Sequence, residues 1–464
     1  MLILISLGVL ALITCGLWIL HKWQRGVIAF VLYTPVSGAV QLLLFPAPWP
    51  ILIKDILFAF PLYIAFFVSG GANVAWRETP KAVKIAVTLF IGVVVVQMLN
   101  PFNPDLTGIL APLIGAKVWL FYVPMISVGI GYADTTHSLI NLSRLMLCLT
   151  WLPCLVGILE YAMSQRLGYD RTMHMFYGDA ALAATQQLTS FSVGLMRIPS
   201  TFSSVTQYLN FILCMLVPAL GLRALERDPF WKRMCTATVG LLCVAGVLCG
   251  ARAAFVTIPL LLGAFYFMKG GYTTLVLPGL VLVAGLYFVL STAGIDISGL
   301  TTLETELVNH YSLESQASFV EATIAASVFG EGVGSNTNEA QPFVKEGMIK
   351  GVENYYAKIV IELGIIGLVI VTTTHLILIY LGLQNHYRLT GSDLRDYADA
   401  ITALLILTFI YDAKGQAIDF DPLNMFYWLF AGVLIHLPNL NHKKNEKVSW
   451  QYDYEGENAF SHQA

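Results

Sequence analysis

Long apolar stretches separated by short polar segments recur along almost the whole chain. A helix of about 20 apolar residues crosses the roughly 30 Å hydrocarbon core of a bilayer. We therefore expect an all-α polytopic membrane protein with about 12–13 transmembrane helices. The expected spans are 2–20, 27–46, 55–70, 85–99, 117–132, 141–160, 204–222, 235–250, 254–268, 272–291, 355–381, 400–412 and 423–437.

The basic residues between these spans fall almost entirely in alternate connections, which places them on one side of the membrane. The positive-inside rule makes that side cytoplasmic, with the N-terminus outside and the C-terminus inside. Residues 1–438 then form one membrane domain, and the polar tail 439–464 is predicted to be cytoplasmic and disordered. The residues that set this orientation are Lys22, Arg25, Arg77, Lys81, Lys84, Arg144, Arg223, Arg227, Lys232, Arg233, Lys269, Arg388, Arg395, Lys443, Lys444 and Lys447.

Composition supports the membrane assignment. Of the 464 residues 57% are hydrophobic and 12% charged, whereas soluble domains carry about 25% charged residues. The net charge of −3 gives no indication of a nucleic-acid partner. The seven cysteines lie in or beside apolar stretches without a CxxC pair, so we expect them to be buried packing residues rather than metal ligands. The first span lacks a basic leader and a cleavage site, and we expect it to be retained.

Two long loops fall on the predicted outer side, at about 161–203 and about 292–354. The second is rich in acidic residues, and loops of this length are uncommon unless they are functional or disordered. Within it, residues 318–329 (SFVEATIAASVF) have helical spacing, which predicts an ordered helix.

Arg252 interrupts an apolar stretch that runs from Cys235 to Met268. As one helix, its 34 residues would reach about 51 Å, which is too long for a single span. The sequence GARAA (250–254) is the expected corner of a helical hairpin, and the alternation of spans puts this corner on the outer side. Arg252 is either a snorkelling side chain at the membrane surface or part of an anion site.

Other cations are also predicted at the outer ends of helices: Arg197, Lys54 and Lys117. Two arginines from different helices suit a pyrophosphate, because each guanidinium binds phosphate oxygens with two hydrogen bonds. For Lys54 a structural pair with the neighbouring Asp55 is the favoured interpretation. The pattern points to a lipid-anchored anionic substrate that enters from the outer leaflet.

Two glutamates follow the second loop. Glu353 lies at the predicted outer membrane boundary and is either a general base for a hydroxyl group or a plain surface carboxylate. Glu362 lies about two and a half helical turns deeper, and we expect it to cap or bridge helices. The segment GEGVGS (330–335) lacks the Gly-Lys-Ser/Thr of a phosphate loop, and the turn 411–424 either lines a sugar groove or is solvated.

Three motifs resemble the O-antigen ligase and O-antigen polymerase superfamily of bacterial membrane glycosyltransferases. RIPSTFSSVTQYLNFIL (197–213) is similar to the family pattern R-x-x-G-T-F, with Ser200 at the glycine position. GARAAFVTIPLLLG (250–263) is similar to its S-R-[ST]-[AG] corner. FGEGVGSN (329–336) with ENYYAKIVIELGIIG (353–367) resembles its G-x-G-x-G segment and its H-N-x-x-L-x-x-x-x-E-x-G signature, with Glu353 in place of the histidine.

This resemblance implies a GT-C-type glycosyltransferase fold whose family-like core covers about 197–381. It implies a glycan donor on undecaprenyl pyrophosphate and metal-independent transfer, without a cofactor, at the outer face of the bacterial cytoplasmic membrane. Arg197 and Arg252 would bind the pyrophosphate, and Glu353 would activate the acceptor hydroxyl. Lys54, Lys117, Asn354 and Tyr356 are assigned to substrate binding. Tyr355, Tyr356 and His310 are weaker candidates for the base.

Because family ligases rely on the histidine that Glu353 replaces, a polymerase of lipid-linked repeat units in exopolysaccharide biosynthesis is favoured. Its acceptor is a growing glycan, and a chain-length regulator is a candidate partner. A ligase that transfers polymer to lipid A-core and a transporter of lipid-linked glycans remain the alternatives. The transporter is less favoured, because the cations cluster at one face rather than along a midplane pathway.

Overall fold

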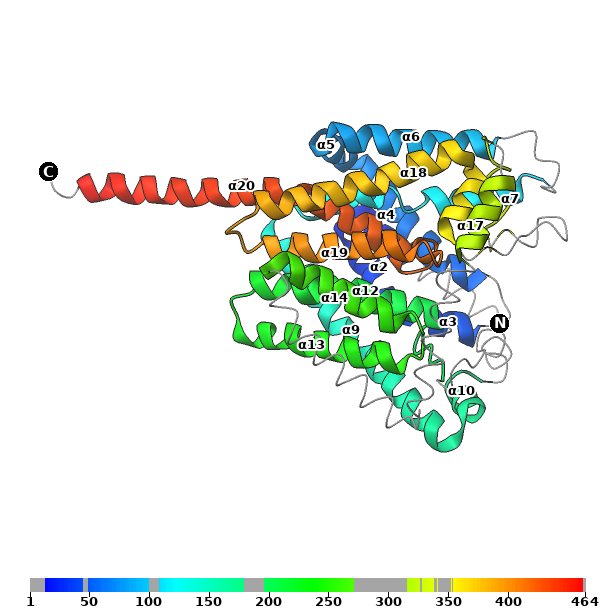
Figure 1. The fold of residues 1–464 in the computed structure, drawn as a ribbon. Coiled ribbons are helices and arrows are strands. Elements are labelled where there is room, and N and C mark those ends of the chain that lie inside the picture. Colours follow the sequence, from blue (N-terminus) through cyan, green and yellow to red (C-terminus); the bar gives the residue numbers. More distant parts are fainter. Residues whose placement is uncertain are drawn as a thin grey trace.

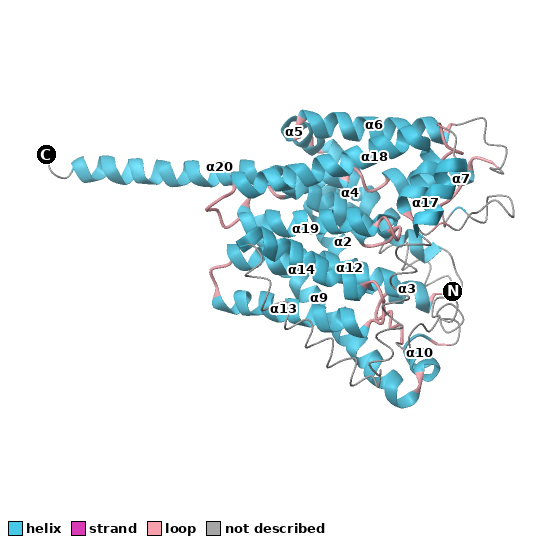
Figure 2. Cartoon of the chain, in the orientation of Figure 1, coloured by secondary structure: helices cyan, strands magenta, loops and turns pink. Residues whose placement is uncertain are grey.

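The computed structural model describes residues 13–44, 49–99, 108–178, 196–270, 315–325, 328–337, 340, 352 and 354–461. Every regular element in these residues is a helix (Figure 2). The expected all-α architecture is therefore confirmed for this part of the chain.

Helices of the first half begin at residue 13, where 13–21 are helical. They continue as α2 (Gln24–Tyr33), η1 (Thr34–Val36), α3 (Ser37–Leu43), η2 (Trp49–Leu52), the π-helix η3 (Asp55–Ala59), α4 (Phe60–Val68), α5 (Gly71–Glu78), α6 (Lys81–Met98), α7 (Leu110–Leu120), α8 (Met125–Tyr132), α9 (Thr136–Leu167) and α10 (Tyr169–Tyr177). The second half contains α12 (Val205–Leu225), α13 (Pro229–Leu248), α14 (Ala254–Gly270), α17 (Ser315–Ala325), α18 (Tyr355–Arg388), α19 (Arg395–Tyr411), η7 (Ala417–Asp419) and α20 (Leu423–Ser461).

In the described part of the chain, eight helices are long and apolar enough to cross a membrane, or nine if a bent pair counts as one span. The bent pair joins Asp55–Val68 to Gly71–Glu78 at 80°. One further apolar helix, α14, has 17 residues and falls just short of this length. α19 also has 17 residues, and it carries three charged residues near its start. The chain is thus a multi-pass membrane protein by helix length and hydropathy. Of the expected spans, 272–291, residues 2–12 of the first and residues 45–46 of the second lie outside the described residues.

The helices run roughly along one common axis, with α12 near the centre (Figure 1). Nearly every residue of α12 is buried, because α9, α13 and α19 pack around it. α6 lies against α18, and the first part of α20 lies against α8. The apolar side chains of α12 pack against other helices. On the outer faces of α6 and α13, by contrast, large apolar side chains such as Val96 and Val244 are exposed.

The connections gather at the two ends of this bundle. We use the name loop-rich end for the end that carries segments 196–204, 249–253, 328–337 and 411–422, together with α10 and α17 (Figure 1). At the opposite end Arg144 forms a salt bridge of 2.7 Å with Glu226, and Lys269 pairs with Asp396.

α20 extends far beyond the bundle at the opposite end (Figure 1). It remains helical to Ser461, through residues that the sequence predicts to be a disordered tail. Lys, Glu and Gln, which have high helix propensity, recur in this stretch.

Candidate functional site

The corner between α13 and α14 lies where the sequence predicts it. α13 ends at Leu248 and α14 begins at Ala254, and Gly250 between them has a φ of 71°. Arg252 lies in this turn with a partly buried side chain. The long apolar stretch is therefore two helices joined by a tight turn, and Arg252 is not in the middle of a span.

The segment that carries Arg197 lies directly against this corner. The backbone N–H of Ile198 donates a hydrogen bond of 2.9 Å to the carbonyl oxygen of Cys249. A Cβ atom added to Gly250 would lie 3.3 Å from the Cα of Arg197. Two segments that are about fifty residues apart in the sequence are thus in backbone contact. This contact brings the backbones of Arg197 and Arg252 to the same place at the loop-rich end.

Hydrogen bonds connect Ser200, three residues after Arg197, to α9 and α10. Ser200 has a φ of 53°, in the left-handed region that favours glycine, and its hydroxyl donates to the Pro153 carbonyl at 2.6 Å. The Tyr177 hydroxyl lies 2.6 Å from Glu160 Oε1 and 2.5 Å from the Ser200 carbonyl oxygen. Burial and the neighbouring Glu160 raise the pKa of Tyr177 well above its ordinary range, so the hydroxyl keeps its proton.

Glu362 holds the glycine-rich segment 328–337 against α18. Its Oε1 accepts hydrogen bonds of 2.9 Å from the backbone N–H of Asn336 and from the hydroxyl of Thr337. Its Oε2 accepts one of 2.6 Å from the indole N–H of Trp119 on α7. The carboxylate is fully buried, and these three donors satisfy it. The bridging role expected for Glu362 is confirmed.

α18 is broken two residues later, at Gly364. The φ of Gly364 is 73° and its ψ is −175°, which interrupts the helix. A Cβ atom at this position would lie 2.6 Å from the backbone nitrogen of Gly330, so only glycine allows the two backbones to approach. The first two turns of α18 are in this way separated from the long span that follows.

The start of α18 is tied to the turn that follows α19. The Asn354 side chain caps the helix by accepting from the Ala357 N–H at 3.1 Å, and it donates to the Ala413 carbonyl at 2.7 Å. The backbone N–H of Tyr355 points to the Asp412 carbonyl oxygen, at 3.0 Å. Asn354 is thus buried in a structural role, whether or not it also meets a substrate.

Two side chains reinforce this tie. Gln416 donates to the Val352 carbonyl at 2.6 Å. Lys358, only 1% exposed, forms a salt bridge of 2.6 Å with Asp419 and lies 5.0 Å from the centre of the Trp119 ring. Glu353 lies between Val352 and Asn354 in the sequence but is outside the described residues. The same holds for His310 and for most of the expected loop 292–354.

The two lysines assigned to substrate binding are ion-paired at the same end. Lys54 pairs with Asp421, whereas Asp55 forms a salt bridge of 2.9 Å with Lys117 and accepts a hydrogen bond from Tyr122. A structural pair was expected for Lys54, but its partner is not the neighbouring Asp55, because adjacent residues of a helix point in different directions. The side chain of Lys117 is 32% exposed and that of Lys54 is 6% exposed. Lys117 is the more accessible of the two.

Tyr356 completes the set of predicted site residues. Its hydroxyl donates to the Phe409 carbonyl at 2.6 Å, which joins α18 to α19. A hydrogen bond of 3.2 Å from Asn210 on α12 to the Ala417 carbonyl connects this region to the helix that follows the Arg197 segment. The structure therefore places the arginine corner and the start of α18 at one end of the bundle and joins them through α12.

Sequence reasoning missed Lys358 as a structural residue. A lysine four residues before Glu362 inside an apolar run is the available signal, because a charge within a span needs a partner. The same reasoning left open whether the turn 411–424 is solvated. In the structure Asp412 is buried, Asp419 is mostly buried and Asp421 is paired, so the acidic side chains of this turn are not simply solvated.

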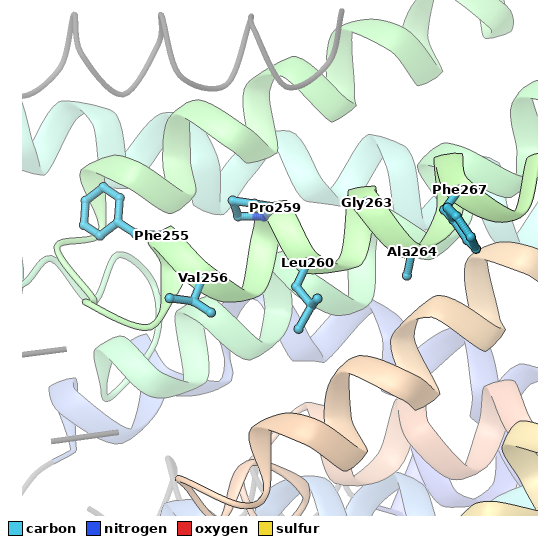
Figure 3. A pocket seen from close by; sticks show the side chains of 7 residues that line it. All are labelled: Phe255, Val256, Pro259, Leu260, Gly263, Ala264 and Phe267. Carbon is cyan, nitrogen blue, oxygen red and sulfur yellow. The ribbon is translucent and has the colours of Figure 1, made fainter. Parts of the chain in front are cut away.

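A shallow, open apolar surface lies along α14 after the arginine corner. Figure 3 shows its side chains spread from Phe255, three residues after Arg252, to Phe267 near the end of the helix. The lining residues are Phe255, Val256, Pro259, Leu260, Gly263, Ala264 and Phe267.

Among the described residues no three His, Cys, Asp or Glu side chains form a group able to hold a metal ion. All seven cysteines are free thiols. No protein-family model matches the chain, and no curated protein is significantly similar to it in sequence.

Proposed function

We propose that the protein is a membrane glycosyltransferase that joins lipid-linked oligosaccharide repeat units into a polysaccharide. The observation that carries the proposal is the backbone contact between the Arg197 segment and the Arg252 corner. It gathers two guanidinium-bearing residues at one end of an all-helical membrane bundle, where the polar headgroup of a lipid-linked donor would lie. The motif resemblance supports the same assignment, including a GT-C-type organisation.

In the proposed reaction the acceptor hydroxyl oxygen attacks the anomeric carbon of the donor with inversion. A new glycosidic bond forms, and the bond between the anomeric carbon and the pyrophosphate oxygen breaks. Arg197 and Arg252 neutralise the negative charge that develops on the leaving pyrophosphate. The hydroxyl proton passes to Glu353, whose carboxylate acts as general base.

The surroundings of the corner fit a substrate with a lipid chain. The first residue of the apolar surface on α14, Phe255, is three residues after Arg252 in the sequence, so a polyprenyl chain lying along this surface would leave its diphosphate near the arginine corner. The predicted outer orientation then puts the reaction on the extracytoplasmic side of the cytoplasmic membrane. Undecaprenyl-pyrophosphate-linked units serve as donor, and the growing glycan is the acceptor.

The test is elongation of lipid-linked repeat units by the purified protein. Arg197→Ala and Arg252→Ala are each expected to lower the rate by about 10²–10³-fold, the usual effect of removing one charge-stabilising donor. Glu353→Gln is expected to abolish turnover while substrate binding remains. Arg388→Ala is the matched control, because Arg388 is an exposed arginine at the opposite end of α18.

The products separate the alternatives. If all three site variants elongate as fast as the wild type, the site assignment is wrong. In cells that lack the protein, single repeat units on the lipid carrier at the outer face indicate a polymerase. Accumulation at the inner face indicates a transporter, and long polymer that fails to reach its final acceptor indicates a ligase.

A further inference from the structure

α17 has one face that packs on the protein. Phe319 and Ala322 lie on this face and contact Ala357 and Ile361 in the first turns of α18. With 11 residues, α17 is about 17 Å long and cannot cross a bilayer. It therefore belongs to the loop-rich end and not to the set of spans.

The other face of α17 is apolar and exposed. Val320 is 52% and Ile324 81% exposed, and the stripe continues beyond the helix with Val328 at 54% and Phe329 at 65%. The first three are spaced four residues apart, so the two in the helix lie on one side of it. We call these four residues the α17 stripe. Large apolar side chains exposed together outside a span indicate a surface that is covered in the native environment.

The α17 stripe is continuous with the outer surface of two membrane spans. The side chain of Gln97 on α6 donates a hydrogen bond to the carbonyl oxygen of Phe329, so the stripe adjoins the end of α6. There Val96 and Leu99 are each 66% exposed.

On its other side the stripe meets α18. The break at Gly364 packs on the backbone of residues 328–330, and Ile365 and Ile366 directly after it are each 41% exposed. α6 and α18 are both candidate spans, and their exposed apolar side chains face lipid. Among the described residues, the α17 stripe therefore prolongs the exposed apolar surface of α6 and α18 to the loop-rich end.

We propose that α17 is an interfacial helix that inserts the α17 stripe among the acyl chains of the leaflet at the loop-rich end. Its partner is the bilayer itself. Glu321 fits this placement, because it is exposed and lies roughly 60–100° around the helix from Val320 and Ile324, toward water. The insertion holds the first turns of α18 at the depth of the lipid surface, and it does not depend on the activity proposed above.

Photocrosslinking in a bilayer tests this placement. Benzoylphenylalanine is introduced at position 324 of the full-length chain. Position 321, three residues earlier in the same helix, is the matched control. Each variant is reconstituted in nanodiscs of palmitoyl-oleoyl-phosphatidylcholine, and only monodisperse protein is irradiated. Mass spectrometry is expected to find several-fold more phospholipid adduct at position 324 than at position 321.

Equal lipid adducts at the two positions would overturn the proposal, and so would adducts at position 324 that are mainly with protein. A spin label at the same two positions gives an independent reading. Position 324 should be more accessible to oxygen, which partitions into lipid, and position 321 to a water-soluble nickel complex. The reverse order would also refute the insertion of the stripe.

Discussion

Replacing Lys358 with methionine is expected to destabilise the protein strongly, even though methionine preserves most of the apolar packing of the lysine chain. Lys358 is 1% exposed, and the side chain of its partner Asp419 is 10% exposed. The variant removes the Lys358 charge from the Asp419 carboxylate, in a site that little water reaches. Loss of one partner from a buried pair typically costs about 3–5 kcal/mol.

The double variant Lys358→Met with Asp419→Leu separates the effect of the pair from the effect of an isolated charge. Replacing both partners of a buried pair with apolar residues is often close to neutral. The double variant should therefore recover most of the stability that the single variant loses. The matched surface control is Lys269→Met, since Lys269 is 47% exposed and pairs with Asp396 at the opposite end. Its expected cost is about 0–1 kcal/mol.

The free energy of unfolding is measured by denaturant titration in mixed micelles, with tryptophan fluorescence as the signal. A loss below about 1 kcal/mol for Lys358→Met would show that the ion pair is not a buried one. A double variant no more stable than the single variant would show that the loss does not come from the Asp419 carboxylate left without Lys358. Either result would refute the role assigned to this pair.

Three further substitutions test the backbone and hydrogen-bond interpretations. Gly364→Ala forces a side chain into a left-handed position against backbone atoms and should cost at least about 1–3 kcal/mol; Gly92→Ala, in open space on α6, should be neutral or slightly stabilising. Ser200→Gly relieves the left-handed strain but loses the bond to Pro153, so its Tm should stay near that of the wild type. Ser200→Ala keeps the strain, loses the same bond and should lower the Tm clearly. Glu362→Ala removes the acceptor of three buried hydrogen bonds and should cost more than about 3 kcal/mol in the same titration; a smaller loss would contradict the anchoring role.

The sequence predicts those features that depend on local pattern. The corner at Arg252 follows from a length argument, because no single helix of that length fits a bilayer. The helix α17 follows from spacing within the acidic loop, and the membrane class follows from composition. These predictions need no knowledge of which helices are neighbours.

Pairings between distant segments are beyond that reasoning. The choice of Asp421 rather than Asp55 as partner of Lys54 depends on how α20 approaches η3. The break at Gly364 depends on the backbone of residues 328–330, which is far away in the sequence. The contact of Ile198 with Cys249 is likewise a product of tertiary packing. The sequence indicates that these residues need partners, and the fold selects them.

The pairing of Lys54 with Asp421 has a consequence for the biogenesis of the protein. The cation enters the membrane with the first tenth or so of the chain, whereas its counter-ion emerges from the ribosome only after nearly all other helices. The ion pair between Lys54 and Asp421 therefore cannot form until almost the whole chain has been synthesised, so this link between the first and last parts of the bundle is a late event in the assembly of the protein.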